Sequence, residues 1–190
     1  TNGTDQQDPR PQGIRIQHGD ATHEMYLSRK PNITTKAEKA ATSTPLQPPY
    51  PQWDVIDLDP YGSAAPFLDG AVQAVQDGGL LCITCTDMAA LGGSHPETCF
   101  GRYSAMPIPR AGYLQELAVR ILLQSTASSA ARYGRSIKPI LSVGMNFYVR
   151  VFVEVYKDKA AVHKHSLNIG SVYQSTQCPS FQVAAAGQLG

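Results

Sequence analysis

Charged residues, cysteines and long apolar runs are all scarce in this chain of 190 residues. Four cysteines do not suggest the disulfide framework of a small secreted protein, and Cys82 and Cys85 lie inside an apolar run expected to be a strand. No stretch of about 18 or more apolar residues is present, so the sequence predicts no membrane span. Residues 1–13 are polar, unlike a signal peptide. We therefore expect an intracellular protein with reduced thiols.

The first quarter of the chain carries few signals of a packed core. Residues 1–13 are expected to form a loop or a disordered segment, residues 14–16 a short strand, and residues 21–29 a helix. Residues 30–52 are rich in Lys, Thr, Ala and Pro. That composition predicts a flexible insertion, because it offers too little apolar surface to bury.

The clearest structural unit lies between residues 53 and 85. An apolar run predicts a strand over 53–58, and an apolar stripe predicts a helix over about 64–76 with Ser63 as its cap. Asp77-Gly78-Gly79 is expected to end this helix, and residues 80–85 are expected to form the next buried strand. A strand, a helix and a second strand in succession are typical of an α/β fold.

The second half of the chain predicts the completion of this sheet. Residues 91–109 contain Gly92-Gly93 and several prolines, which predicts a long loop at the ligand-binding edge. A helix is expected over 113–131. Two strands, 137–143 and 147–156, are expected to form an antiparallel hairpin joined by Gly144-Met145-Asn146. Residues 14–156 would then form one domain, and residues 157–190, with a strand near 169–174, would begin a second.

The strand over 53–58 ends in Asp59-Pro60-Tyr61-Gly62, where open α/β sheets bind their ligands. Turns of the type Asp/Asn-Pro-aromatic occur in methyltransferases that act on exocyclic or amide nitrogens. The amino group of a base is a poor nucleophile because its lone pair is delocalised into the ring. Asp59 and the Pro60 carbonyl can accept hydrogen bonds from such an amino group at a fixed angle, and Tyr61 offers a flat face for a base taken out of its stack. An ordinary strand-ending turn is the alternative.

A longer resemblance accompanies this turn. The runs that carry it follow one another in the order Asp57-Leu-Asp-Pro-Tyr-Gly-Ser63, Phe67-Leu-Asp69, Gly78-Gly-Leu-Leu-Cys-Ile-Thr-Cys-Thr-Asp-Met88, Glu97-Thr-Cys-Phe100, Arg120-Ile-Leu-Leu123 and Phe147-Tyr-Val-Arg-Val-Phe-Val153. In these runs the chain resembles the tRNA guanosine-26 N2-dimethyltransferase family, over roughly residues 14–182 except the insertion. The resemblance implies a Rossmann-like class I methyltransferase sheet that ends in an antiparallel hairpin, S-adenosylmethionine as the cofactor, and tRNA as the substrate.

The resemblance also assigns cofactor residues. In such enzymes an acidic residue after the third strand receives the adenine amino group. Asp20 is similar to that residue, with Ala21 giving a backbone N–H toward the ring. Asp57 lies two residues before Asp59 on the same face of its strand, where it is expected either to line the cofactor pocket or to satisfy a neighbouring backbone group. The Gly-rich turn after the first strand and the acidic residue ending the second are not found before residue 14. We therefore expect a sheet that is incomplete at its N-terminal side and binds the cofactor weakly or not at all alone.

The distribution of charge bears on an RNA partner. Residues 1–100 hold 6 Lys and Arg against 12 Asp and Glu, whereas residues 101–190 hold 10 against 3. An acidic half beside a basic half fits a catalytic mouth next to a phosphate-contacting surface, for which Arg102, Arg110 and Lys138 are candidates. The alternative is that these residues only solvate the protein surface.

Metal and localisation follow from the same resemblance. Ser175 stands where relatives have the first cysteine of a zinc-binding pair that ends at Cys178, so we expect no metal. We also expect a monomer, without membrane association, in the nucleus, the mitochondrion or both if the source is eukaryotic.

Two other functions remain open from the sequence. A non-catalytic RNA-binding paralogue that has lost its cofactor site would explain the missing Gly-rich turn and Ser175. An amino-methyltransferase acting on adenine, cytosine or glutamine would typically carry a second proline where Tyr61 stands. Cofactor binding would distinguish the methyltransferase from the non-catalytic RNA-binding paralogue. Methylation assays on RNA, DNA and protein would distinguish it from an amino-methyltransferase with another substrate.

Overall fold

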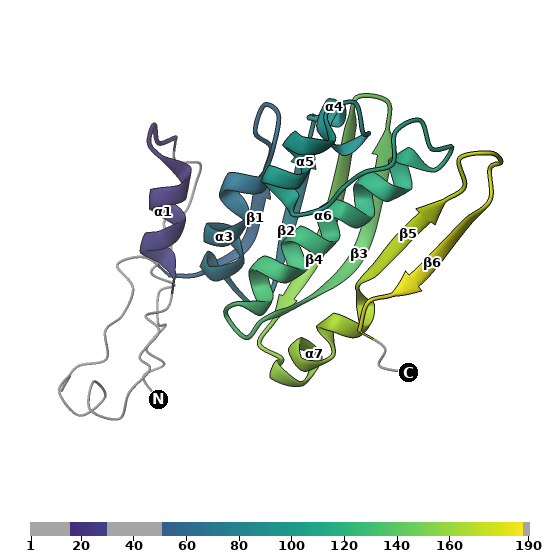
Figure 1. The fold of residues 1–190 in the computed structure, drawn as a ribbon. Coiled ribbons are helices and arrows are strands. Elements are labelled where there is room, and N and C mark those ends of the chain that lie inside the picture. The colour runs from purple at the N-terminus through teal and green to yellow at the C-terminus, as the bar shows by residue number, and fades with distance from the viewer. Residues whose placement is uncertain (1–15, 30–50, 188–190) are drawn as a thin grey trace, which may run out of the picture.

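A computed structural model describes residues 16–29 and 51–187 and shows helices packed on a mixed sheet (Figure 1). Its helices are α1 (Ala21–Ser28), α3 (Ala65–Ala74), α4 (Met88–Leu91), α5 (Pro96–Tyr103), α6 (Leu114–Ala131), α7 (Lys159–His163) and the short 3-10 helix η1 (His165–Asn168). Its strands are β1 (Trp53–Leu58), β2 (Val75–Cys85), β3 (Ser136–Met145), β4 (Tyr148–Tyr156), β5 (Gly170–Gln174) and β6 (Phe181–Ala185).

The main sheet has the strand order β1-β2-β4-β3. β1 and β2 are parallel, whereas β4 runs antiparallel to both of its neighbours, β2 and β3. The predicted α/β class and the closing antiparallel hairpin are therefore confirmed. β5 and β6 form a separate two-stranded sheet. Within the described ranges, β1 pairs only with β2.

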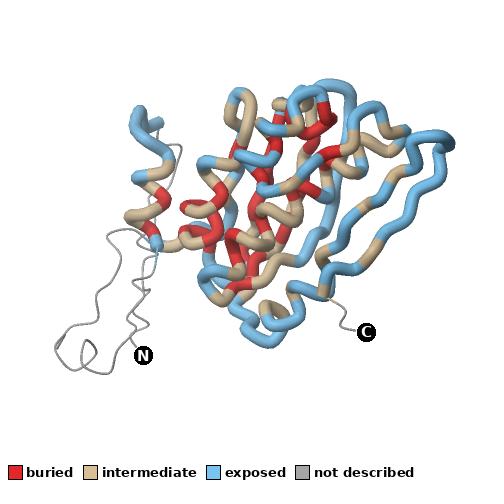
Figure 2. Tube along the Cα trace, in the orientation of Figure 1, coloured by how far each residue is buried: buried red, intermediate tan, exposed pale blue. Residues whose placement is uncertain are grey.

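The core lies between this sheet and the helices on one of its faces. α3 and α6 cover that face, and the buried residues in Figure 2 follow the central strands and the inner sides of these helices. The sequence of β4 explains why the core lies on one face, because its side chains alternate between buried and partly exposed. Its four valines, 149, 151, 153 and 155, are completely buried, as a strand with one covered face requires.

α1 packs against α3 and is attached to it through Asp69. The Asp69 carboxylate accepts hydrogen bonds from the hydroxyls of Tyr26 on α1 (2.9 Å) and Tyr133 (2.8 Å), and from the Arg132 guanidinium (3.1 Å). Burial alone would raise the pKa of Asp69, but these hydrogen bonds outweigh it and hold the pKa below its ordinary value. An ionised Asp69 thus joins α1 and the end of α6 to α3.

Several predicted boundaries were wrong. The helix predicted to reach residue 76 ends at Ala74, and β2 begins at Val75, so Gly78-Gly79 lies inside the strand rather than at a helix end. The predicted loop over 91–109 contains α5. β3 extends to Met145, so the hairpin turn is Asn146-Phe147. Ile16 lies outside any strand, and the rest of the first predicted strand and residues 30–50 lie outside the described residues.

Gly79 is needed where β2 passes β1. A Cβ at this position would lie 2.7 Å from Val75 Cγ2 and 2.8 Å from the Asp54 carbonyl oxygen. We expect Gly79→Ala to lower the free energy of unfolding by about 1–3 kcal/mol, since the strand must shift to relieve the overlap. Thermal unfolding followed by circular dichroism measures the effect. Gly101→Ala on α5 is the matched control, because nothing lies within 4 Å of its added Cβ and alanine favours the helix. An unchanged Tm for Gly79→Ala would contradict the expectation.

Candidate functional site

Three chain reversals meet at one edge of the main sheet. β3 is parallel to β1 and β2 because β4 is antiparallel to both β2 and β3, so all three strands have their carboxyl ends at the same edge. Residues 59–62 follow β1, residues 86–87 follow β2, and Asn146-Phe147 follows β3. We call this the carboxyl edge, where open α/β sheets place their ligands.

The Asp59–Gly62 turn is tied to the end of β2. The Gly62 N–H donates to Thr86 Oγ1 (2.8 Å), and the Thr86 N–H donates to the Gly62 carbonyl (2.8 Å). Gly62 has a φ of 96°, which a residue with a side chain rarely adopts. The turn therefore has a fixed conformation, while the side chains of Asp59 and Tyr61 stay exposed.

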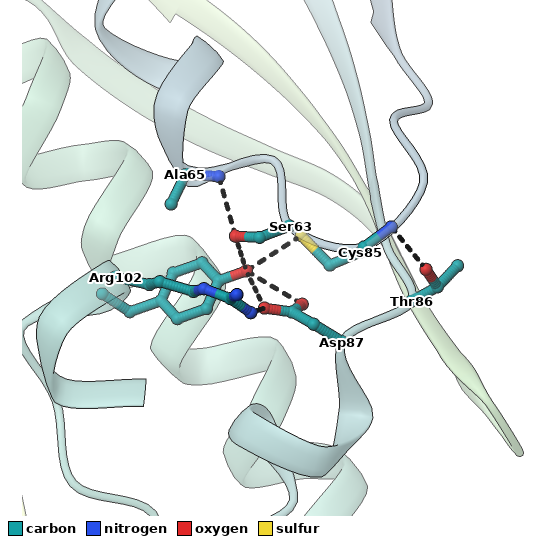
Figure 3. Close-up of polar contacts among 8 residues, drawn as sticks. Ser63, Ala65, Cys85, Thr86, Asp87 and Arg102 are labelled. Carbon is teal, nitrogen blue, oxygen red and sulfur yellow. Dashed lines mark hydrogen bonds and ion pairs between the residues drawn. The ribbon is translucent and has the colours of Figure 1, made fainter. Parts of the chain in front are cut away.

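A buried tyrosine that the sequence analysis missed lies beneath this turn. The Tyr103 hydroxyl lies 2.7 Å from Ser63 Oγ and 3.0 Å from both carboxylate oxygens of Asp87. The Asp87 carboxylate can only accept, so the single Tyr103 O–H donates to it and Ser63 Oγ donates to Tyr103; Ser63 Oγ also accepts from the Ala65 N–H (3.2 Å). Figure 3 shows Ser63, Asp87 and Arg102 converging there. Burial raises the pKa of Tyr103, so the phenol stays neutral and remains a donor.

The three predicted RNA contacts do not come together. Arg102 Nη1 donates to Asp87 Oδ2 at 3.0 Å, so its guanidinium already supports the buried network. Arg110 is exposed in the segment before α6, with a φ of 58°. Lys138 lies near the start of β3, toward the opposite edge, with its ammonium 3.6 Å from Glu154. Arg110 is therefore the candidate with no partner among the described residues that would compete for a phosphate.

Asp57 lies on the sheet face opposite α3 and α6, paired with an arginine from β4. Arg150 Nη2 donates to both of its carboxylate oxygens, at 3.0 and 2.8 Å, and Arg150 Nη1 donates to Thr84 Oγ1. The hydrogen bond to Asp57 raises the pKa of Arg150 above its ordinary value. This ion pair spans three adjacent strands, β1, β2 and β4, and fixes the strand that leads into Asp59.

Asp20 caps α1. Its Oδ1 accepts from the Thr22 N–H (2.8 Å) and from the His23 N–H (3.2 Å), as expected of an N-cap aspartate. Both bonds use Oδ1, and no described residue donates a hydrogen bond to Oδ2. Ala21 is the first residue of the helix, and α1 begins at the level of the carboxyl edge (Figure 1). The cap thus orients an exposed carboxylate, one oxygen of which has no partner among residues 16–29 and 51–187.

The β5–β6 hairpin places Ser175 and Cys178 in its turn. Hydrogen bonds from Ser175 and Ser180 lower the pKa of the exposed Cys178 thiol to about 7. In the described part of the chain, no three His, Cys, Asp or Glu side chains gather to hold a metal ion. Nor is any helix there long and apolar enough to cross a membrane.

Cys178 is expected to be the first cysteine modified by iodoacetamide. Its thiolate fraction passes one half near pH 7, whereas burial raises the pKa of Cys85 and of Cys99 to about 11. The labelling rate should therefore rise between pH 6 and pH 8 and then level off, because only the thiolate attacks. Mass spectrometry after short exposure identifies the site, and Cys178→Ser should abolish native-state labelling. Equal labelling of all four cysteines would contradict this expectation.

Comparison with known proteins identifies a consistent set of relatives. The family model described as N2,N2-dimethylguanosine tRNA methyltransferase matches residues 25–188. The chain is 51% identical over 137 residues to tRNA (guanine(26)-N(2))-dimethyltransferase 2 of Arabidopsis thaliana, covering 72% of this chain and 23% of that protein. It is 36% identical over 139 residues to the mitochondrial tRNA (guanine(26)-N(2))-dimethyltransferase of Saccharomyces cerevisiae, covering 73% of this chain and 24% of that protein.

A solved structure has the same fold. It is Trm1 from Pyrococcus horikoshii in complex with S-adenosyl-L-methionine, which superposes with a TM-score of 0.76 and 28% sequence identity, covering 92% of this chain and 41% of that one. The predicted methyltransferase sheet is thereby confirmed. The chain spans about a quarter of the length of the curated relatives that it matches.

Proposed function

Because this chain belongs to the N2,N2-dimethylguanosine tRNA methyltransferase family, we propose that it forms part of an enzyme that transfers methyl groups from S-adenosylmethionine to the N2 amino group of guanine 26 in tRNA. One observation carries the proposal: the exposed Asp59 and Tyr61 stand on a turn fixed by the two Gly62–Thr86 hydrogen bonds. A rigid acceptor beside an aromatic ring is what an exocyclic amine requires of an enzyme.

Asp59 and Pro60 activate the amino group in this proposal. The Asp59 carboxylate and the Pro60 carbonyl accept hydrogen bonds from the N2 amino group and turn its lone pair out of conjugation with the ring. As the nitrogen–carbon bond forms and the carbon–sulfur bond of the donor breaks, the nitrogen becomes cationic and loses a proton, which Asp59 can accept. Positioning supplies most of the rate, because the reaction is a direct displacement.

Tyr61 supplies the stacking surface. Its ring is fully exposed, with a relative accessibility of 106%, and the turn beneath it is anchored on Thr86. An aromatic ring this exposed contributes nothing to the protein core, whereas stacking against a flipped base would bury one of its faces. The side chain therefore suits a base removed from the tRNA stack.

The residues assigned to the cofactor fit its adenine end. Asp20 Oδ2 is free to accept from an adenine amino group, because capping occupies only Oδ1, and the Ala21 N–H lies beside it at the start of α1. Asp57 acts through Arg150, which neutralises it and holds β1 in place. When bound, the cofactor would supply the electrophilic methyl group. Asp20 and the Ala21 N–H would orient its adenine end, and Asp57 would act indirectly through Arg150.

The tRNA is the proposed partner of the whole protein, which works as a monomer in the nucleus or mitochondrion. Arg110 is the most available phosphate contact, with Arg102 and Lys138 as further candidates whose present partners, Asp87 and Glu154, would be exchanged or shared. Residues 14–156 form the catalytic unit of the proposal, and residues 157–190 begin a second domain. The β5–β6 hairpin in that second part contacts the first through Tyr113, whose hydroxyl donates to Gln174 Oε1 at 2.7 Å.

Calorimetry with S-adenosylmethionine, followed by methyl transfer to tRNA transcripts, tests the proposal on the full-length protein. We expect cofactor binding, together with methylation of a transcript carrying G26 but not of one carrying A26, since adenine has no N2 amino group. Binding of tRNA without binding of the cofactor would overturn the proposal in favour of a non-catalytic RNA-binding protein. Equal methylation of the two transcripts would overturn the assignment of the target.

A further inference from the structure

Phe147 occupies the turn between β3 and β4 at the carboxyl edge, and no described element covers it. Its side chain is 85% exposed, although phenylalanine has no polar group that favours water. The turn itself is held in place, because Gln115 Nε2 on α6 donates to Asn146 Oδ1 at 3.2 Å. The ring therefore projects from an anchored turn on the same edge as Asp59.

The backbone of Phe147 is also strained. Its φ is 81°, a value that glycine and asparagine tolerate but that a bulky side chain rarely adopts. Asn146, the residue before it, would suit this conformation better. An exposed aromatic side chain in a conformation that costs free energy, with no packing in return, points to a contact with something outside the chain.

The position of Phe147 limits which part of a substrate it can contact. In the order β1-β2-β4-β3, the turn that joins β3 to β4 lies two to three strands from β1. At about 4.8 Å between neighbouring strands, the two turns are roughly 10–14 Å apart across the sheet. That distance exceeds the reach of one base ring. A base held at Asp59 and Tyr61 therefore cannot also stack on Phe147, whereas a neighbouring nucleotide can.

We propose that Phe147 stacks on an unpaired nucleobase that flanks the target guanine, and so sets the affinity for the RNA substrate. The inference rests on the proposed function for the identity of the substrate class. A nucleobase is the occupant that fits, because stacking uses the flat face of the ring and needs no hydrogen bond from it. The ring is 85% exposed on its turn, and contact with a base would offset the free energy that the positive φ costs.

Substitutions that separate strain from stacking test this role in the full-length protein. Phe147→Gly and Phe147→Asn both suit a positive φ, so we expect a Tm equal to or above that of the parent. Both should bind a G26 tRNA transcript about 5- to 150-fold more weakly, since each stacked base contributes about 1–3 kcal/mol. Phe147→Trp keeps a stacking ring and should bind within about threefold of the parent.

Steady-state kinetics should show an effect on RNA binding and none on the chemical step. KM for tRNA should rise in Phe147→Gly, whereas kcat at saturating tRNA and the Kd for S-adenosylmethionine should not change. Leu167→Asn is a matched control, because Leu167 is a half-exposed apolar residue in η1, beside α7. Unchanged tRNA affinity in Phe147→Gly and Phe147→Asn would overturn the inference, as would a loss confined to kcat or to cofactor affinity.

The proposed function and this inference fail separately. A parent protein that binds the transcript without methylating it contradicts the proposed function, and its tRNA affinity still tests Phe147. A parent that methylates G26 with normal kinetics, and whose Phe147→Gly variant does the same, contradicts only the inference.

Discussion

Replacing Asp59 by alanine is expected to lower kcat for methylation of G26 by about 10²- to 10⁴-fold, the range typical of losing a positioned acceptor of a proton. Asp59→Asn should fall between the parent and Asp59→Ala, because its amide oxygen still accepts a hydrogen bond but cannot take the proton. The Kd for S-adenosylmethionine should be nearly unchanged, since Asp59 is assigned to the amino group of the base. Radiolabelled methyl transfer and calorimetry measure the two effects.

The loss should not reflect unfolding. Asp59 is exposed, and exposed substitutions usually change stability by less than about 0.5 kcal/mol. Glu97→Gln is the control, because Glu97 is an exposed carboxylate in the first turn of α5 whose nearest basic side chain, His95, is 3.8 Å away. Near-parental kcat in Asp59→Ala would remove Asp59 from the mechanism and transfer its role to the Pro60 carbonyl or another acceptor.

The unit from β1 to α3 was predictable because its signals are local. The apolar run of β1, the proline that cannot continue a strand and the glycine that reverses the chain each act within a few residues. The predicted strand matches β1, and the predicted helix overlaps α3 with one misplaced end. Pairing is not local, and for that reason Gly78-Gly79 was misread as a helix stop. Gly79 is small because β2 passes close to the Asp54 carbonyl of β1, and Gly78 has a φ of 78°, which favours glycine.

The site was predicted only in part, because some of its residues are identified by local sequence patterns and others only by contacts distant in the sequence. Asp59 and Tyr61 follow from a short sequence pattern, whereas Tyr103 is 40 residues from Ser63 and 16 from Asp87 along the chain. No sequence spacing links them, and the region around Tyr103 reads as a loop because it is rich in glycine and proline. A helix signal was nevertheless present, in Pro96 at the first helical position and Glu97 in the first turn.

The two sides of the Asp59–Gly62 turn have different roles. On its outer side, Asp59 and Tyr61 are exposed, as the proposed contact with a base requires. Below it, Tyr103 and Asp87 satisfy one another and hold Ser63, which starts the turn into α3. A precise reactive surface requires such a supported layer, because loosely held acceptors do not fix the angle of approach.

Truncating Tyr103 is accordingly expected to be the most destabilising single change in the described region. The side chain is 1% exposed and is the largest of the fully buried side chains. Tyr103→Ala should lower the free energy of unfolding by about 3–5 kcal/mol, because it leaves a cavity and removes the donor to Asp87. For a chain of this size, this corresponds to a fall in Tm of roughly 6–20 °C.

Tyr103→Phe isolates the hydroxyl. It keeps the packing but leaves the Asp87 carboxylate, 8% exposed, with Arg102 as its remaining side-chain partner. We expect a loss of about 1–3 kcal/mol, the cost of an incompletely satisfied buried acceptor. Tyr173→Phe, at an exposed position on β5, should change stability by less than about 0.5 kcal/mol. If Tyr103→Phe unfolded at the same temperature as the parent, the hydroxyl would not support the turn, and the rigidity of the Asp59 site would rest on the Gly62–Thr86 hydrogen bonds alone.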